Sequence, residues 1–410
     1  MSEAKRAGLS AERLKRLDEV LRDRYLAAGD IPGAHIQVWR RGVLAHSSLL
    51  GAMDIDRKTA LREDAIYRIY SMSKPITGVA VLMLAEEGKL DLDDDVAKHI
   101  PEWADLRVYA AGQRGDFKTL PQARQMKVVD LVTHTAGLTY PNTNATNVDA
   151  AYRTLDIGVS TTEGGLTTFV RQLAGVPLEF SPGTAWHYSM AMEVLGYLVE
   201  KISGLSFGEF LRTRIFAPLG MVDTGFYCPE DKLGRLVMPY VGSPDQPLVV
   251  DEDARTRFAR KPKLESGGGG LVSTTADYMR FCRMLLGGGT LDGVQILSPK
   301  SVAMFSTNLL PGGREATEMF FRPVPGEDLN LGGCGYSVCC ATTIDLGRRR
   351  MPGSLGEFFW SGAAMTNFWV DPKEDLTVVF MTQVRNSPHH FKIQRVLRQL
   401  VYGAFTEAND

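Results

Sequence analysis

The fold of this chain is decided by a stretch at residues 71–88, which reads SMSKPITGVAVLMLAEEG. The stretch predicts a helix with a sharp start and a sharp stop. Ser71 or Ser73 can cap the first turn, and Pro75 is tolerated only within that turn, where its missing N–H had no partner in any case. Gly88 supplies the left-handed residue that ends the helix. Because the interior is apolar on nearly every side, we expect a central, buried helix.

The start of this helix also carries a candidate nucleophile and base. Ser71 and Lys74 are three residues apart, so their side chains are neighbours on one helix face. A desolvated neutral amine can take the proton of an attacking hydroxyl, and free N–H groups at a helix start can stabilise the resulting oxyanion. The spacing alone is not specific, because Ser2 and Lys5 repeat it in the N-terminal tail. The alternative is a plain helix cap at Ser71 and a solvated cation at Lys74.

Both ends of the chain predict β-hairpins. Runs of apolar and β-branched residues lie at 35–39 and 43–49 around a turn at 41–42, and at 366–370 and 376–382 around a turn at 371–375. An amphipathic helix at 10–28 precedes the first hairpin, and a helix at 391–405 follows the second. We therefore expect an α/β fold of the α+β kind: an antiparallel sheet built from both chain ends and flanked by helices, with an inserted, mainly helical domain.

This pattern also predicts the domain organisation. We expect a discontinuous sheet domain of residues 1–80 plus 266–410, a mainly helical inserted domain of residues 81–265, and an active site at their interface. Two stretches look flexible. Residues 104–125 are polar and lack a clear period, and residues 243–270 are charged and end in Ser-Gly-Gly-Gly-Gly.

Several further segments turn the spacing at Ser71 into a family resemblance. The segment YRIYSMSKPITG at 67–78 resembles the active-site segment of the serine β-lactamase and penicillin-binding-protein superfamily. Segments in that family's order follow along nearly the whole chain: LVTHTAGL at 131–138, PLGMVDTGF at 218–226, GGGGLVSTTAD at 267–277 and FWVDP at 368–372. The resemblance is greatest to the class C β-lactamase-like esterases, called family VIII carboxylesterases. The chain is also similar to the fungal statin-side-chain acyltransferases.

The resemblance implies the rest of a catalytic site. Tyr188, in the string WHYSM, matches the family's catalytic tyrosine, and a phenol near Lys74 can share a proton and later protonate a leaving alcohol. The string FWSGA matches the family's third motif, which supplies a backbone N–H that pairs with the Ser71 N–H as an oxyanion hole. Ala363 is the matching donor. Gly362 is expected to let this strand approach the substrate closely.

Two departures from the family pattern indicate the substrate class. Trp360 stands where β-lactamases place a lysine, so the cation that meets a β-lactam carboxylate is missing. Met190 stands where they place an asparagine, so the amide that holds the acylamino side chain is missing. We expect a site that favours uncharged, apolar esters and binds anionic antibiotics weakly. Tyr140 matches a position that lines the acyl pocket, with core packing as the alternative.

Composition narrows the function further. The chain has 410 residues, with 46 basic and 48 acidic side chains and a net charge of −2. Near-neutral charge gives no reason to expect nucleic acid or an anionic membrane as partner. No apolar run approaches about 18 residues, and the charged start has no signal-peptide core. Five cysteines without a zinc or redox spacing are expected to be buried free thiols in a cytoplasmic protein. We expect no metal, no cofactor and no obligate protein partner.

Other motifs carry a simpler interpretation. The string GLSFG at 204–208 fits the nucleophile elbow of α/β-hydrolases, but a helix precedes it, so its serine is expected to cap the next helix. The acidic run at 91–95 is expected to cap a short helix rather than bind calcium. The histidine pair at 389–390 lacks metal-ligand partners. His134 is expected to bond backbone in a helix-ending turn, and His187 to line the pocket mouth.

Together these residues predict a serine carboxylesterase that hydrolyses small, uncharged, short-acyl esters through an acyl-enzyme on Ser71, with weak cephalosporin hydrolysis as a side activity. The first alternative is an acyltransferase that passes the acyl group to an alcohol or amine. Another is a β-lactamase or D-amino-acid peptidase. The last is a catalytically silent sensor that forms a stable acyl adduct.

Overall fold

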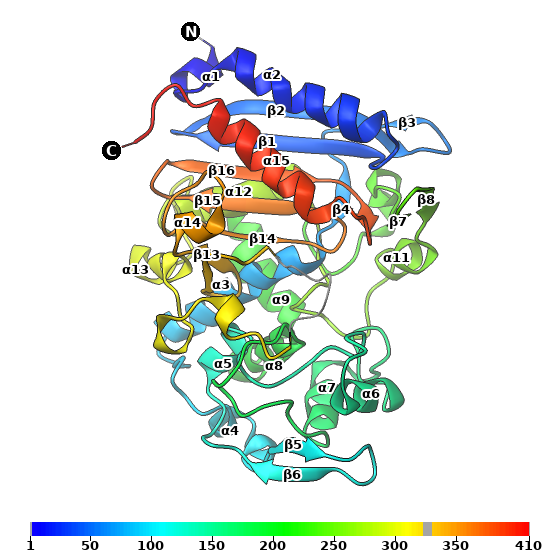
Figure 1. Cartoon of the computed structure of the whole chain (residues 1–410), viewed down its shortest axis with the longest axis vertical. Coiled ribbons are helices and arrows are strands. Elements are labelled where there is room, and N and C mark those ends of the chain that lie inside the picture. The colour runs from blue at the N-terminus through cyan, green and yellow to red at the C-terminus, as the bar shows by residue number, and fades with distance from the viewer. Residues whose placement is uncertain (1, 323–329, 410) are drawn as a thin grey trace.

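The computed structural model describes residues 2–322 and 330–409, and an eight-stranded antiparallel sheet organises it. In spatial order the strands are β12 (Cys334–Tyr336), β13 (Ala341–Thr343), β14 (Phe358–Ser361), β15 (Asn367–Asp371), β16 (Leu376–Met381), β1 (Gly33–Arg40), β2 (Val43–Asp54) and β3 (Thr59–Ala60). The N-terminal and C-terminal strands join where β1 pairs with β16. Both chain ends lie beside the sheet (Figure 1). The predicted α+β fold with a sheet built from both ends is confirmed.

Helices cover both faces of this sheet. α2 (Ala11–Val20) continues into a π-helical turn (Leu21–Leu26) and packs against α15 (His390–Gly403). α12 (Thr275–Leu286) contacts β1, β15 and β16. It lies behind the sheet in Figure 1, while α15 crosses the front. All six residues of β16 are buried, as expected for a strand that is covered on both sides.

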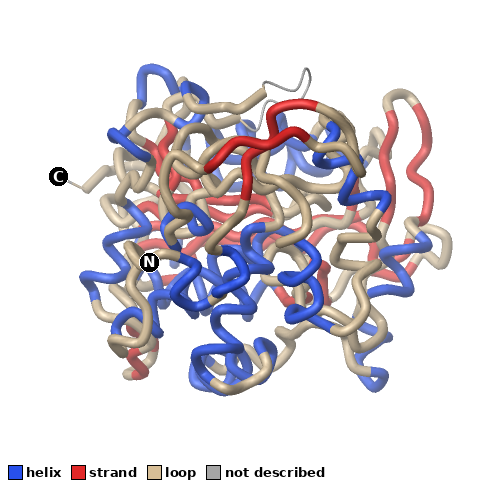
Figure 2. Tube along the Cα trace, turned by 90° about the horizontal axis from the view of Figure 1, so that it is seen from below, coloured by secondary structure: helices blue, strands red, loops and turns tan. Residues whose placement is uncertain are grey.

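The helical part below the sheet is centred on α3 (Ser73–Glu86) and α8 (Ala191–Ser203), which pack against each other. Twelve residues of α3 are buried, which confirms the predicted central helix. The other described helices are α1 (Glu3–Arg6), α4 (Val96–His99), α5 (Val128–Val132), α6 (Asn147–Thr154), α7 (Gly165–Leu173), α9 (Phe207–Leu211), α10 (Ala217–Leu219), α11 (Glu252–Arg257), α13 (Pro299–Ala303) and α14 (Leu346–Arg349). Seen from below, helices and loops of the helical part lie in front of the strands of the large sheet (Figure 2).

The start of α3 differs from the prediction. Neither Ser71 nor Ser73 caps the helix, because a 3₁₀ turn (Tyr70–Met72) runs directly into it and the N-cap residue Met72 already has helical dihedral angles. The Ser73 hydroxyl instead accepts a hydrogen bond from the backbone N–H of Leu271 at 3.2 Å. Ser71 is therefore free of a capping role.

Two stretches that looked flexible contain regular structure. Residues 104–125 form a hairpin of β5 (Arg107–Ala111) and β6 (Lys118–Pro121), and residues 243–270 begin at the hairpin of β7 (Tyr240–Ser243) and β8 (Gln246–Val250) and continue through α11. Most residues of β5 and β6 are exposed or half-buried, so their sequence lacks the period that a half-buried strand would give.

The remaining strands are β4 (Ile66–Arg68), β9 (Val272–Thr274), β10 (Thr290–Leu291), β11 (Val294–Gln295) and β17 (Val384–Arg385). The domain boundaries at 80 and 266 stay a prediction.

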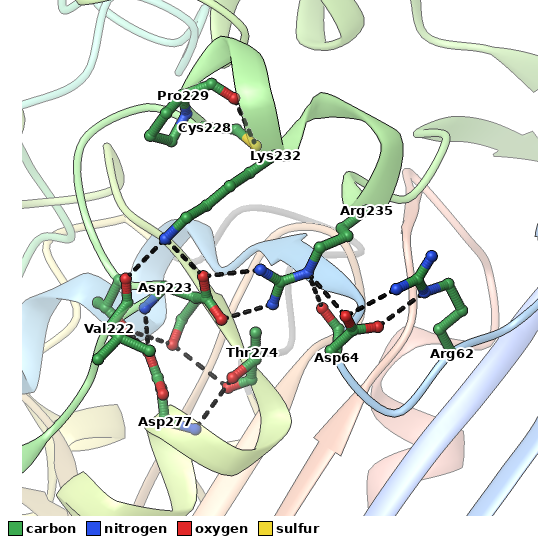
Figure 3. Close-up of polar contacts among 12 residues, drawn as sticks. Arg62, Asp64, Val222, Asp223, Cys228, Pro229, Lys232, Arg235, Thr274 and Asp277 are labelled. Atoms are coloured by element: carbon green, nitrogen blue, oxygen red, sulfur yellow. Dashed lines mark hydrogen bonds and ion pairs between the residues drawn. The ribbon is translucent and has the colours of Figure 1, made fainter.

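A polar network ties the segment after α10 to the rest of the protein (Figure 3). Asp223 accepts hydrogen bonds from Lys232 Nζ at 2.8 Å and from Arg235 Nη1 at 2.9 Å. Arg235 also pairs with Asp64, just before β4, at 3.0 Å. The backbone N–H of Asp223 donates to Asp277 on α12 at 2.7 Å. This segment is thereby fixed to the turn before β4 and to α12.

The composition led to expectations about the cysteines and about membrane-spanning helices. All five cysteines are buried and unpaired, which confirms the expected free thiols. Within residues 2–322 and 330–409, no helix has both the length and the apolar character needed to cross a membrane.

His35 on β1 generates a prediction about acid stability. It is 1% exposed and neither ring nitrogen has a partner among the described residues, and burial lowers its pKa to about 4. Between pH 6.5 and 4 the unfolded chain binds a proton at this histidine that the folded chain does not, so stability falls as the pH falls through that window. Between pH 7 and pH 5 we expect the free energy of unfolding of His35→Leu to fall by about 2 kcal/mol less than that of the wild type.

Urea unfolding at the two pH values measures this difference. His187 and His390, whose pKa values burial also lowers to about 4, leave part of the acid sensitivity in the variant. An equal loss of stability in both proteins would contradict the account of His35.

Candidate active site

The chain enters the candidate site through the turn before α3. Tyr70 has a left-handed backbone, with φ of 44°, and Ser71 follows it in the 3₁₀ turn. Lys74 is the second residue of α3, and its side chain is wholly buried. Lys74 Nζ lies 3.1 Å from Ser71 Oγ. The structure therefore brings together the two side chains that the spacing pairs.

Tyr188 reaches the same hydroxyl from the helical part of the protein. It lies three residues before α8, and the packing of α8 against α3 brings its ring to the start of α3. Its hydroxyl donates a hydrogen bond to Ser71 Oγ at 2.7 Å. Lys74 Nζ lies 4.4 Å from the centre of the Tyr188 ring. The three predicted catalytic side chains form one hydrogen-bonded cluster.

Lys74 has two further partners. Its Nζ donates to the backbone carbonyl of Gly268 at 2.7 Å and to the Tyr140 hydroxyl at 3.3 Å. Ser71, Gly268 and Tyr140 are thus three polar partners of the buried Lys74 amine. Tyr140 borders the larger of the two cavities at the site and also contacts Lys74, and its predicted place in the acyl pocket stays a prediction. Burial raises the pKa of Tyr140, and the neighbouring Tyr188 and Glu193 act in the same direction, so its phenol stays protonated at neutral pH.

Trp360 contacts the tyrosine of the cluster. It lies on β14, is buried, and its indole Nε1 donates to the Tyr188 hydroxyl at 3.3 Å. The centres of the two rings are 5.6 Å apart. Sequence reasoning assigned Trp360 only to substrate binding, and it did not anticipate the hydrogen bond to the phenol.

Two backbone N–H groups, those of Ser71 and Ala363, are available for the expected oxyanion hole. Ser71 and Ala363 border the same cavities, and neither backbone N–H donates a hydrogen bond to another described residue. Gly362 lies between β14 and Ala363. A Cβ at this position would lie 2.3 Å from both the carbonyl oxygen of Ile69 and the Thr366 hydroxyl. The glycine thus permits close packing against the chain that leads to Ser71, and its predicted close approach to substrate stays a prediction.

Ser71 lies where two cavities meet. The larger has a volume of about 1170 Å³, and Tyr140, Met190 and His187 are among the residues that line it. The smaller has a volume of about 150 Å³ and is lined by Trp360 and Gly362 among others. Ser71, Tyr188 and Ala363 border both. Every residue that the sequence assigned to the site, apart from the buried Lys74, thus faces one of these cavities.

The two histidines near the site are neutral. Nδ1 of His134 accepts a hydrogen bond from the backbone N–H of Ser189 at 3.3 Å, and burial lowers its pKa well below the usual value. His187 Nε2 lies 3.0 Å from Thr139 Oγ1, and burial lowers its pKa to about 4. His134 therefore bonds backbone as expected. Neither ring is placed to act on Ser71.

Sequence reasoning missed two residues around Lys74. Gly268 supplies the carbonyl that accepts from Lys74, and Glu193 lies buried beside it on α8. The signal for Gly268 was the run of four glycines at 267–270, which we interpreted as a flexible segment. Glu193 gave no signal, because a glutamate inside an apolar helical pattern is usually solvent-exposed.

The motifs set aside from the sequence are structural. Gly204 has φ of 75° and caps the end of α8, and Ser206 accepts from the Glu209 N–H at 3.2 Å at the start of α9. This confirms that the G-x-S-x-G string joins two helices. His389 pairs with Asp30 at 3.3 Å. Across the described part of the chain, no three His, Cys, Asp or Glu side chains are grouped to hold a metal.

Comparison with known proteins gives matches along nearly the whole chain. The family model described as Beta-lactamase matches residues 18–402. Protein Rv1367c of Mycobacterium tuberculosis is 34% identical over 366 residues, which cover 87% of this chain and 86% of that protein. Esterase EstB of Burkholderia gladioli is 28% identical over 414 residues, covering 97% and 96%. The solved structure of EstCE1, described as a hydrolase with promiscuous acyltransferase activity, has a TM-score of 0.80 at 23% identity and covers 96% and 99%.

The contact between Trp360 and Tyr188 generates a prediction about the reactivity of Ser71. Trp360→Phe keeps the ring but removes the N–H donor, and a lost hydrogen bond of about 1.4 kcal/mol corresponds to about a tenfold lower rate. We expect a fluorophosphonate probe to label Ser71 of the variant about tenfold more slowly.

The matched control is Trp186→Phe, because Trp186 stacks on Tyr188 with ring centres 6.2 Å apart but its Nε1 has no partner among the described residues. We expect its labelling rate to change by less than about threefold. Equal losses in the two variants would show that ring packing, rather than the hydrogen bond, governs the rate.

Proposed function

Because this chain belongs to the β-lactamase family, we propose that it is a serine carboxylesterase that hydrolyses small, uncharged, short-acyl esters through an acyl-enzyme on Ser71. One observation carries the proposal: Ser71 Oγ lies within hydrogen-bond distance of both Lys74 Nζ and Tyr188 OH. A hydroxyl needs such a base to become a nucleophile. The activity of the relative EstB, an esterase, supports the reaction class.

The first half of the reaction transfers the acyl group to the enzyme. Ser71 Oγ bonds to the ester carbonyl carbon while its proton passes to the Lys74 amine. The carbonyl oxygen becomes an oxyanion, which the N–H groups of Ser71 and Ala363 stabilise. When the intermediate collapses, the bond to the alcohol oxygen breaks. Tyr188 donates its proton to that oxygen and recovers one from Lys74, so the alcohol leaves neutral.

The second half restores the enzyme. A water molecule takes the place of the alcohol, and as its oxygen attacks the acyl carbon Tyr188 accepts the water proton while it passes its own phenolic proton to the Lys74 amine. The bond between Ser71 Oγ and the acyl carbon then breaks, the proton returns to Ser71, and the carboxylic acid leaves. Side chains of this chain carry every proton in these steps, so the reaction as written uses no metal or cofactor.

The residues next to the nucleophile support an uncharged substrate. Trp360 and Met190 are both buried and apolar in the positions where a β-lactam would need a cation and an amide. Neither side chain can form an ion pair with a carboxylate. The smaller cavity, at about 150 Å³, suits a short acyl chain.

The alternatives differ in their fit to these observations. Acyl transfer to an alcohol or amine uses the same residues, and the larger cavity of about 1170 Å³ has room for such an acceptor; a product ester that forms when an alcohol is added identifies it. β-Lactamase or D-amino-acid peptidase activity is disfavoured by Trp360 and Met190. A silent sensor is disfavoured because both side chains that assist Ser71 are present.

We propose a small-molecule ester as the ligand. The family VIII character of the chain is part of this proposal, as is a cytoplasmic location, which the five free thiols support because such thiols persist in reducing compartments. Nucleic acid, membranes and obligate protein partners have no role in the proposed reaction.

Loss of the nucleophile tests the proposal directly. Ser71→Ala removes the atom that forms the acyl-enzyme, so we expect kcat/KM for p-nitrophenyl acetate to fall by more than about 10³-fold. After treatment with a fluorophosphonate, intact-mass measurement should show an adduct on the wild type alone. Peptide mapping should place that adduct within residues 67–89.

Ser206→Ala is the matched control, because that serine only caps α9. We expect turnover within about twofold of the wild type and a loss of about 1 kcal/mol in stability. Undiminished hydrolysis by Ser71→Ala, or an adduct that maps elsewhere, would contradict the assignment of Ser71 as the nucleophile.

The substrate class is tested by a comparison of substrates. We expect kcat/KM for p-nitrophenyl acetate to exceed that for benzylpenicillin by more than about 10³-fold, because the antibiotic carboxylate finds no cation at Trp360. Steady-state kinetics with both substrates measures the ratio. Comparable values would contradict the argument from Trp360 and Met190, while leaving the nucleophile assignment intact.

A further inference from the structure

Glu193 is a buried carboxylate that the proposed reaction does not use. It lies on α8, five residues after Tyr188, and is 1% exposed. One carboxylate oxygen accepts hydrogen bonds from the Ser266 hydroxyl and from the Gly268 N–H, the latter at 3.0 Å. The other oxygen has no partner among the described residues. A carboxylate in such surroundings is costly unless a positive charge lies nearby.

Gly268 connects this carboxylate to Lys74. Its N–H donates to Glu193, and its carbonyl accepts from Lys74 Nζ at 2.7 Å. A Cβ at Gly268 would lie 2.6 Å from the nearer Glu193 oxygen, and a Cβ at Gly267 would lie 2.7 Å from the carbonyl of Met192. The glycines therefore let the loop lie directly on α8, and Glu193 holds it there.

The charges around Lys74 single out Glu193. The other titratable groups that face or act on Lys74 are the phenols of Tyr140 and Tyr188, the imidazole of His134 and the thiol of Cys339. Burial raises the pKa of Tyr140 and Cys339 and lowers that of His134, so these three are neutral at pH 7. Burial raises the pKa of Glu193, and Lys74 acts in the opposite direction. Among the described groups, Glu193 is the carboxylate coupled to Lys74.

We propose that Glu193 is a positioning residue that, through Gly268, fixes Lys74 Nζ beside Ser71 and supplies the negative charge that balances Lys74 when it takes up the serine proton. The inference rests on the proposed function. Lys74 is buried, so a positive charge on it is not solvated by bulk water and a nearby carboxylate stabilises that charge. The proton that leaves Ser71 Oγ creates an ammonium in a site without bulk water, and Glu193 compensates it until Tyr188 passes a proton to the leaving alcohol.

Glu193→Gln tests this role, because glutamine keeps the shape and the hydrogen-bond acceptor but removes the charge. The variant lacks the negative charge that balances the protonated base, so the ascending limb of kcat/KM against pH should move to lower pH by about 1 unit. We also expect the plateau value for p-nitrophenyl acetate to fall about tenfold. A limb within about 0.2 unit of the wild type would overturn the proposal, since a merely structural role lowers the plateau alone.

Glu200→Gln is the matched control. Glu200 lies on the same helix, half-buried, and accepts from the Phe207 N–H at 3.0 Å, and it has no contact with Lys74. We expect the ascending limb of kcat/KM against pH for Glu200→Gln to coincide with that of the wild type. A shift equal to that of Glu193→Gln would show that any charge lost from α8 moves the limb, and would overturn the specific role of Glu193.

Glu193→Asp keeps the test decisive if Glu193→Gln does not fold. Aspartate retains the charge but is one carbon shorter, so the limb should stay with the wild type while the plateau falls. A limb displaced to lower pH by more than about 0.3 unit in Glu193→Asp would overturn the proposal. Failure of the proposed function is a separate result: the wild type itself would then hydrolyse no ester, and Ser71 would take no phosphonate.

Discussion

The whole site depends on a lysine whose amine lies inside the protein. Lys74 Nζ has no contact with solvent, so each of its donors must find an acceptor in the chain. The acceptors are Ser71 on the same turn, the carbonyl of Gly268 and the hydroxyl of Tyr140. They come from three distant parts of the sequence. The requirement to satisfy one buried amine thus fixes how three segments meet.

The sheet and the two central helices meet this requirement together. α8 places Tyr188 on Ser71 and Glu193 under the glycine loop. The end of β14 places Trp360 on the phenol, and Gly362 packs against the chain that leads into α3. The sheet and the helical part thus hold opposite sides of the cluster, and the loop that carries Gly268 is fixed to α8 by Glu193. This is the rigidity that proton transfer over a single hydrogen bond needs.

Local patterns predicted the elements well but not the contacts between them. The terminal hairpins and the buried helix follow from alternation, turn residues and an apolar run, and Ser71, Lys74 and Tyr188 follow from spacing and family motifs. The hydrogen bond from Trp360, the carbonyl of Gly268 and the burial of Glu193 depend on tertiary packing, which no local pattern encodes. The β5–β6 hairpin was missed because few of its residues are buried. The expected serine cap failed because the preceding turn is already helical.

The pairing of β1 with β16 has a consequence for synthesis of the protein. During translation the first hairpin leaves the ribosome more than 300 residues before β16 is made, so one edge of β1 stays unpaired until then. Ala363 and Trp360 emerge just before that strand. Until β14 to β16 are made, the nascent chain carries Ser71 without the Ala363 N–H and without the indole that contacts Tyr188, and the site is complete only when these strands have closed the sheet.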